Sequence, residues 1–240
     1  MQRENLRGKN KLRKTSIKTG FMDYAEGSCL IEQGNTKVIC TASVEEGVPG
    51  FLRDTGTGWV TAEYGMLPRA CKSRVIRDRR KGQTSGRTLE IQRLIGRSLR
   101  SVVELKELGE RTIWLDADVI QADGGTRCAS ITGSFVALTE ALKHIKKQGL
   151  IDRLPFTAMV AAVSVGIVDN ELLLDLCFEE DSKAQVDMNV AATSEGELVE
   201  VQATAEGFPF SRDKLDELLE LAKTGITKLI DIQKEALNLK

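Results

Sequence analysis

The sequence predicts an α+β protein, with mixed sheets and with helices packed on the faces of those sheets. Two observations point to this class: β-prone runs come in pairs joined by short turns, and a few long segments have helical periodicity. Hydrophobic residues make up 41% of the 240 residues, which is enough to form a core. There is no short-period repeat and no linker, so we expect a single domain over residues 1–240.

The first predicted elements are a hairpin and a helix. Residues 27–41 form the hairpin, because Gly34-Asn35 is a turn signal between two β-prone runs. Apolar residues recur at near-helical spacing over residues 84–108, which predicts a helix. Thr84 or Ser85 can serve as its N-cap.

A strand and a second helix follow. Residues 112–122 alternate, with aliphatic side chains on one side and Asp116 and Asp118 on the other, which is typical of a half-buried strand. Gly124-Gly125 ends this strand. We expect the next helix to run from about Ile131 to Lys147.

The second half repeats the same pattern. Strands are predicted over residues 158–168 and 171–178, around the turn Asp169-Asn170. Another hairpin joins residues 186–193 to residues 198–204. A closing amphipathic helix covers residues 215–237.

Composition excludes several kinds of protein. The five cysteines are odd in number and lack zinc-ligand spacing, so we expect free, reduced thiols. His144, the one histidine, lies beside lysines in a helical stretch, which argues against a Ser–His or Cys–His hydrolase. The apolar stretch Met159–Val168 is too short for a membrane span, and the polar residues 1–7 do not read as a secretory signal. We therefore expect a cytoplasmic protein.

Positive charge is concentrated in two segments. Residues 69–100 hold eleven arginines and lysines against two acidic residues, a net +9, although the whole chain carries only -1. Residues 1–20 form a second basic run. Such a field predicts a polyanionic partner, usually nucleic acid, because the arginine fork suits phosphate. The alternative is a solvated basic loop without a partner.

Two predicted helix starts have the features of phosphate sites. Gln83–Arg87 places an arginine in a first turn, where acidic residues are usual. Asp123–Arg127 has two glycines followed by Thr126 and an arginine at a strand-to-helix junction. Neither is a P-loop, because its sequence pattern is absent. The alternative for the second site is a tight turn without a ligand.

A third cluster is acidic. Residues 179–187 hold Glu179, Glu180, Asp181 and Asp187 between two predicted strands. Carboxylate oxygens that leave water positions free suit Mg²⁺. The alternative is an exposed acidic turn.

Four motifs together resemble the ribonuclease PH family of phosphorolytic 3′→5′ exoribonucleases. They are WVTAEYGMLPRA from Trp59, GRTLEIQRLIGRSLR from Gly86, DVIQADGGTR from Asp118 and EEDSKAQVDMNV from Glu179. The resemblance covers nearly the whole chain. It implies a fold like the second domain of ribosomal protein S5 and a homohexameric ring, a trimer of dimers.

The resemblance also implies an activity. Inorganic phosphate would attack the 3′ end of transfer-RNA precursors and release nucleoside diphosphates, reversibly, with a further part in ribosomal RNA processing or degradation. No histidine base is required, because phosphate is itself the nucleophile. The implied roles are phosphate binding by Arg87, Gly125, Thr126 and Arg127, catalysis and binding of Mg²⁺ or another divalent cation by Asp181 and Asp187, and RNA binding by Arg69, Arg74, Arg77 and Arg93.

Some features leave alternatives open. The N-terminal Leu6–Asn10 departs from the usual Asp-Gly-Arg opening of the family, so the part of the first residues in the RNA path is open. A non-catalytic RNA-binding ring subunit would keep the basic segment but could dispense with Arg127, Asp181 and Asp187. A metabolic enzyme for a small phosphorylated molecule would explain the phosphate sites but not the basic segment.

Overall fold

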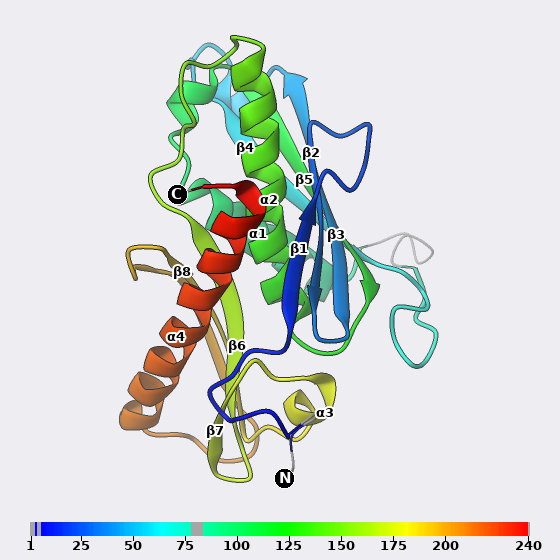
Figure 1. Ribbon diagram of the computed structural model, residues 1–240, viewed down its shortest axis with the longest axis vertical. Helices are drawn as coiled ribbons and strands as arrows, with labels where there is room; N and C mark the ends of the chain where they lie inside the picture. Colours follow the sequence, from blue (N-terminus) through cyan, green and yellow to red (C-terminus); the bar gives the residue numbers. More distant parts are fainter. Residues whose placement is uncertain (1–2, 4–5, 78–83, 240) are drawn as a thin grey trace.

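The computed structural model describes residue 3 and residues 6–77 and 84–239, and within them the chain forms two sheets with helices between and around them (Figure 1). The first sheet has the order β1-β2-β3-β5-β4. Its strands are β1 (Thr15–Thr19), β2 (Gly27–Gln33), β3 (Thr36–Glu46), β4 (Trp59–Met66) and β5 (Arg111–Gln121). Neighbouring strands are antiparallel except β4 and β5, which are parallel.

The second sheet is antiparallel and has the order β7-β6-β8-β9. Its strands are β6 (Val160–Val168), β7 (Glu171–Leu174), β8 (Val186–Thr193) and β9 (Leu198–Ala205). The turn between β6 and β7 is the predicted Asp169-Asn170, where both residues have positive φ angles of 50° and 61°. Asn and Asp adopt this left-handed conformation more readily than most residues do, so the turn prediction is confirmed.

Helix α2 (Thr126–Lys147) is the centre of the core. It packs against β2, β3 and β5 of the first sheet and against β6 of the second. Because it is covered on several sides, it is apolar or small nearly all round, unlike a surface helix. At Gly133 a Cβ would lie 2.7 Å from the Cys40 sulfur, so only glycine permits this close approach of helix to sheet.

Three further α-helices lie in the described part of the chain. Helix α1 (Gly86–Arg100) covers β4, and α4 (Arg212–Leu237) lies along β6 and also contacts β1. The short α3 (Phe178–Asp181) connects β7 to β8 and lies beside the N-terminal segment (Figure 1). The α+β class is confirmed, with mixed sheets and helices on their faces.

Several boundaries differ from those predicted; β3, for example, extends to Glu46 instead of residue 41. The first helix ends at Arg100 instead of residue 108, because the chain turns to pair with residues 155–157: the Glu104 amide donates to the Pro155 carbonyl, at 2.7 Å. The second helix begins at Thr126 instead of Ile131. The strand predicted to end at Phe178 ends at Leu174, since Asp175 has a positive φ of 57° and turns the chain toward α3.

Two strands were missed and several predictions were right. β1 was missed because four of its five residues are polar, and β4 was not predicted although buried residues alternate along it. The hairpins β2–β3 and β8–β9 and the alternating strand β5 are confirmed.

All five cysteines are free thiols. In the described part of the chain, the helices are each too short or too polar to cross a membrane.

Candidate active site

The starts of α1 and α2, helix α3 and strand β8 meet at one cleft of about 460 Å³. Six of the residues singled out from the sequence line it: Arg87, Gly125, Thr126, Arg127, Asp181 and Asp187. A neighbouring groove of about 610 Å³ also contains Arg87. The tertiary structure therefore brings together three sequence segments that are separated by about 40 to 60 positions each.

The start of α2 exposes backbone amides. Gly125 is the N-cap in the left-handed conformation, φ 67°, and no side chain caps the helix. The first turn contains no acidic residue. A Cβ at Gly124 would lie 2.6 Å from the Leu176 carbonyl oxygen, so the turn is pressed against the chain that leads to α3. Uncapped amides and the helix dipole favour an anion at this place.

Arg127 is held in position by two side chains. Its Nη1 donates to Oε1 of Gln202 at 2.7 Å and pairs with Oε1 of Glu90 at 3.3 Å. Gln202 also donates to Glu90, at 2.9 Å. Next to it, the Thr126 hydroxyl lies 3.0 Å from the Tyr64 hydroxyl. These contacts orient the arginine while leaving further donors of its guanidinium for a ligand.

Arg87 occupies the first turn of α1, as the sequence predicts. Ser85 is the N-cap and accepts from the Thr88 amide at 3.2 Å, so of the two candidate caps Ser85 is confirmed. The first turn contains no acidic residue, and Arg87 is exposed to solvent. No ion pair ties Arg87 to a carboxylate among the residues described. A cation at a helix start is unfavourable for the helix alone and becomes favourable when an anion binds there.

Asp181 and Asp187 both line the cleft and their side chains interact with each other. Burial and the charge of Asp181 raise the pKa of Asp187 to about 6, against the opposing charge of Arg127. Burial also raises the pKa of Asp181, although Arg127 and Arg87 oppose the shift. Oδ1 of Asp187 is buried and has no hydrogen-bond partner in the part of the chain that is described. The charge of Asp181 destabilises the charged form of Asp187, and a bound cation would relieve this repulsion.

The donor set fits a hard cation with few protein ligands. Within the described residues there is no group of three or more His, Cys, Asp or Glu side chains that could hold a metal ion. Mg²⁺ is nevertheless commonly bound by one or two carboxylates, with water and substrate phosphates as its other ligands. Asp181 and Asp187, with one buried oxygen unpaired, suit that mode.

The remaining members of the acidic cluster have other positions. Glu179 is exposed, as an acidic turn would be. Glu180 is buried and pairs with Arg3 at 2.7 Å, so it belongs to the scaffold and not to the cleft. The cluster of residues 179–187 is thus divided between surface, scaffold and cleft.

The arginines assigned to RNA lie outside the cleft. Arg69, Arg74, Arg77 and Arg93 are all exposed. Arg77 lines the neighbouring groove together with Asp118. Burial raises the pKa of Asp118, and the charge of Arg77 opposes this shift only in part. The described residues do not include Arg79, Arg80 and Lys81 of the basic segment or Gln83 of the predicted helix start.

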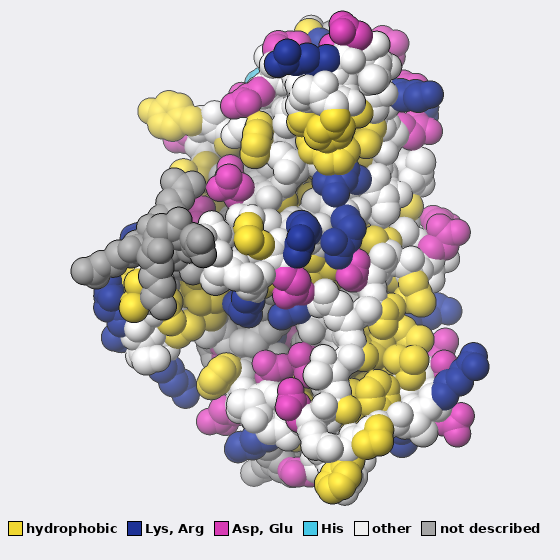
Figure 2. All heavy atoms as spheres, turned by 180° about the vertical axis from the view of Figure 1, so that it is seen from behind, with side chains coloured by type: hydrophobic (Ala, Val, Ile, Leu, Met, Phe, Trp, Pro, Cys, Tyr) yellow, Lys and Arg dark blue, Asp and Glu magenta, His cyan; other side chains and the backbone are white. Residues whose placement is uncertain are grey.

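Two other arginines of the basic segment have structural partners. Arg97 pairs with Glu200 at 3.1 Å, and the Arg100 guanidinium stacks on Trp59 at 4.3 Å from the ring centroid. The net +9 of this segment therefore overstates the charge available to a ligand. On the face shown in Figure 2, basic and acidic side chains are interspersed.

Sequence reasoning missed several residues of the cleft. Asn189 lies two positions after Asp187 on β8, and Ser164 lies on the adjacent strand β6. The i, i+2 spacing of Asp187 and Asn189 is a signal that was available, because alternate residues of a strand share a face. Phe178 and Ser164 gave no such signal, since only the fold brings them to the cleft.

Comparison with known families places both halves of the chain. The model of the 3′ exoribonuclease family, domain 1, matches residues 11–143, and the model of domain 2 of the same family matches residues 158–225. Ribonuclease PH of Moorella thermoacetica is 60% identical over 237 residues, which are 99% of this chain and 95% of the relative. Ribonuclease PH of Syntrophomonas wolfei is 56% identical over 237 residues, 99% of each chain.

Solved structures share the fold at low identity. Rice (Oryza sativa) Rrp46 has a TM-score of 0.78 at 18% identity, covering 96% of this chain and 98% of the rice chain. A chain of the Archaeoglobus fulgidus exosome with RNA bound to the active site has a TM-score of 0.79 at 23% identity, covering 96% of this chain and 92% of that one.

Proposed function

Because the chain belongs to the 3′ exoribonuclease family, we propose that the cleft between the starts of α1 and α2 and the Asp181–Asp187 pair is its active site. The protein is a phosphorolytic 3′→5′ exoribonuclease, a nucleotidyltransferase of tRNA processing that uses inorganic phosphate as co-substrate. Its fold is the α+β fold of the second domain of ribosomal protein S5. The observation that carries the site assignment is the meeting of an uncapped helix start, two arginines and two carboxylates with raised pKa values in one cleft.

Phosphate is held by the cradle, defined as the Gly125 and Thr126 amides with the side chains of Arg87 and Arg127. An oxygen of the bound phosphate attacks the phosphorus that joins the last nucleotide to the rest of the RNA. The bond from that phosphorus to the preceding O3′ breaks, and the O3′ takes up a proton. The product is a nucleoside diphosphate, so a phosphodiester is exchanged for a diphosphate and the reaction is reversible.

The charges of the cleft explain why the arginines are needed. Two anions must approach each other, and charge-assisted hydrogen bonds from Arg87, Arg127 and the helix amides offset their repulsion. Each such bond contributes about 1.5–3 kcal/mol. Phosphate is already largely dianionic near neutral pH, so no histidine base is required.

A divalent cation, Mg²⁺ in the first instance, belongs to the proposal. Before phosphate binds, Arg87 and Arg127 balance Asp181 and Asp187 in formal charge, so a phosphate dianion and the RNA phosphate leave the cleft negative. Asp181 and Asp187 would hold the cation, and its chemistry would be to stabilise charge that develops on the scissile phosphate.

RNA binding, assembly and location complete the proposal. Arg69, Arg74, Arg77 and Arg93 contact the RNA backbone of tRNA precursors and of other RNA 3′ ends, including ribosomal RNA, which their exposure supports. Residues 1–240 act as one domain, and six copies form a ring as a trimer of dimers, which the resemblance to ribonuclease PH supports. The free state of all five thiols supports a cytoplasmic location.

One assay tests the activity against its rivals. The protein is incubated with a 3′-extended tRNA and Mg²⁺, with and without phosphate. Shortening only with phosphate and release of nucleoside diphosphates is the expected result. Full-rate release of monophosphates without phosphate would refute phosphorolysis, and binding without shortening in either condition would favour a non-catalytic ring subunit.

A further inference from the structure

The N-terminal basic run does not form an RNA-facing surface throughout, because three of its arginines point into the protein. Arg3 and Arg13 are 7% and 6% exposed, and the Arg7 side chain is 9% exposed. Their partners are Asp175 and Glu180, whose side chains are each 1% exposed. We call these five residues the N-terminal clamp.

Arg13 connects two parts of the protein that hold the proposed active site. On one side, its Nη2 donates to Oδ1 of Asp175 at 2.7 Å, its Nε lies 3.1 Å from both carboxylate oxygens, and its backbone amide donates to Oδ2 at 2.7 Å. On the other side, its guanidinium donates to the carbonyl oxygens of Asp123 and Gly124. One planar fork therefore bridges Asp175 and the glycine turn at the start of α2.

These carbonyl contacts determine which way the amides of Gly124 and Gly125 point, and the Gly125 amide belongs to the cradle. In a trans peptide the C=O and the N–H point in opposite directions. Donors behind the Asp123 and Gly124 carbonyls therefore turn the amides of Gly124 and Gly125 away from Arg13. Gly124 and Gly125 line the cleft and Arg13 does not, so the amides are turned toward the side where phosphate would bind. A Cβ on Gly125 would lie 3.1 Å from Arg13 Nη2, which shows how closely the guanidinium backs the turn.

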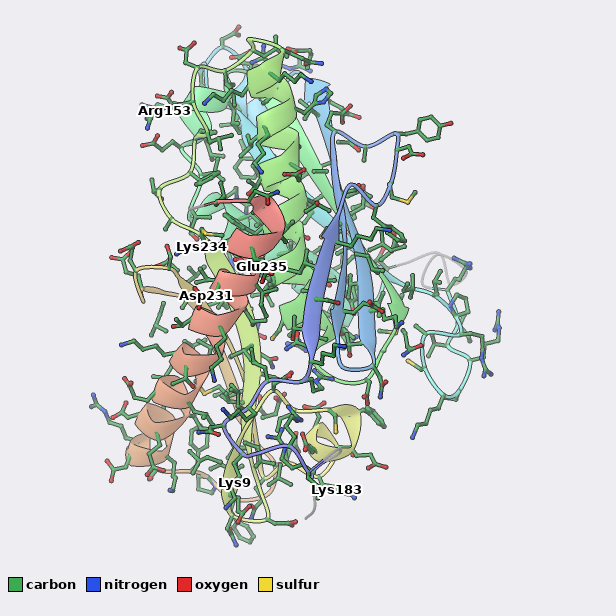
Figure 3. All side chains as sticks on the ribbon, viewed as in Figure 1. Lys9, Arg153, Lys183, Asp231, Lys234 and Glu235 are labelled. Atoms are coloured by element: carbon green, nitrogen blue, oxygen red, sulfur yellow. The ribbon has the colours of Figure 1, made fainter. Side chains whose placement is uncertain are left out.

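The clamp also holds the segment that carries the carboxylates. Glu180, the residue before Asp181, accepts from Arg3 at 2.7 and 2.9 Å and from Arg7 at 3.2 Å. The Phe178 amide donates to Oδ1 of Asp123 at 3.3 Å, which ties α3 directly to the same turn. The N-terminal segment lies beside α3, and Lys9 and Lys183 lie at the same end of the molecule in Figure 3.

We propose that Arg13 is a positioning residue for phosphorolysis, which sets the phosphate cradle against the carboxylate segment without touching substrate. This inference rests on the proposed active site. A single point charge cannot replace it, because lysine lacks the planar fork that reaches a carboxylate and two carbonyls together. A displacement of the cradle by about 1 Å is enough to reduce a rate by roughly 100-fold.

The test is a comparison of Arg13→Lys with Arg111→Lys. Arg111 also joins a carboxylate and a carbonyl, pairing with Glu46 at 2.8 Å and donating to Leu108 at 2.9 Å, but it lies at the opposite end of β5. We expect Arg13→Lys to raise the phosphate KM by about tenfold and to lower kcat, with the RNA Kd changed by less than about twofold. Arg111→Lys should leave all three constants unchanged.

A second variant tests the inference if Arg13→Lys does not fold. The Thr36 hydroxyl donates to the same Gly124 carbonyl at 2.7 Å and accepts from the Asp123 amide at 3.0 Å, so Thr36→Val should raise the phosphate KM in the same direction. An unchanged phosphate KM in every folded variant would overturn the inference. An equal loss of RNA affinity in Arg13→Lys would also overturn it, by placing Arg13 in the RNA path. A wild-type protein that needs no phosphate would instead overturn the proposed function.

Discussion

Glu180 and Asp181 are neighbours in the chain, yet their carboxylates have opposite surroundings. Burial raises the pKa of Glu180, but hydrogen bonds from Arg3 and the Cys177 amide and the charges of Arg3 and Arg7 outweigh it, so its pKa lies below the ordinary value. Burial raises the pKa of Asp181, and the charges of Arg127 and Arg87 do not fully offset it. One carboxylate is satisfied by the protein and the other is not.

The same contrast holds between the N-terminal clamp and the cleft. In the clamp, Asp175 and Glu180 are paired with arginines whose other N–H groups donate to backbone carbonyl oxygens. In the cleft, Oδ1 of Asp187 has no hydrogen-bond partner in the described structure, and Arg87 is exposed. Identical residue types therefore stabilise the fold in one region and leave their charge for a ligand in the other. The following changes test this difference, beginning with the largest effect.

Asp175→Asn should destabilise the protein most. It removes the charge that neutralises Arg13, while Arg7 keeps its other partner Glu180. The buried Arg13 cation is left without compensation, which costs about 3–5 kcal/mol of unfolding free energy. Urea denaturation measures this. Glu171→Gln is the matched control, because Glu171 pairs with Lys9 at 2.7 Å on the surface, where a pair contributes about 0–1 kcal/mol. Equal losses of unfolding free energy in both variants would contradict the distinction between the clamp and a surface ion pair.

Arg87→Ala should act on turnover and not on stability. Removing one donor to a reacting anion lowers kcat by about 100- to 1,000-fold, and Arg127→Ala should do the same. RNA binding without phosphate should largely survive. Arg97→Ala, on the same helix but paired with Glu200, is the control for loss of a helix arginine. A loss of RNA affinity that matches the loss of activity would count against the phosphate role.

Asp187→Asn should abolish turnover yet raise the midpoint of thermal unfolding. The folded pKa of about 6 lies above the unfolded value of 3.8, so near neutral pH the charged carboxylate destabilises the native state. The penalty is absent below about pH 4, grows as the pH rises to about 6 and is constant above that. The gain in stability should follow this course in melts over a pH series. Mg²⁺ should stabilise the wild type more than the variant, and a collapsed circular dichroism spectrum would show that Asp187 is structural.

Neutralising Arg74 and Arg77 together should have the smallest effect. Both are exposed and none of the described carboxylates pairs with them, so folding should be unaffected. RNA affinity should fall, and the slope of its logarithm against that of salt concentration should flatten by roughly 1.4, or 0.7 for each lost contact to single-stranded RNA. Neutralising Lys146 and Lys147, at the other end of α2, is the control. An unchanged slope would show that these arginines do not contact the RNA backbone.

Much of the fold followed from local patterns. Periodicity and turn residues located both β-hairpins, the strand β5 and the long helices, because these signals act over a few positions. The predicted helix does not continue beyond Arg100, because residues 102–104 pair with residues 155–157. No local signal in the sequence reveals this long-range pairing. The cleft was predicted in its chemistry, since Arg87, Arg127, Asp181 and Asp187 stood out by residue type and by their place at element ends.

The sequence by itself determined where helices and strands form and which side chains can carry phosphate chemistry, because both depend on residue type and short spacing. Only the tertiary structure decided which charges are used internally. Arg3 reaches Glu180 across 177 positions and Arg13 reaches Asp175 across 162, whereas Arg87 meets no described carboxylate within ion-pair distance. Whether an arginine holds the protein or awaits a ligand depends on the partners that folding brings within about 4 Å, and a basic run in the sequence has the same appearance in both cases.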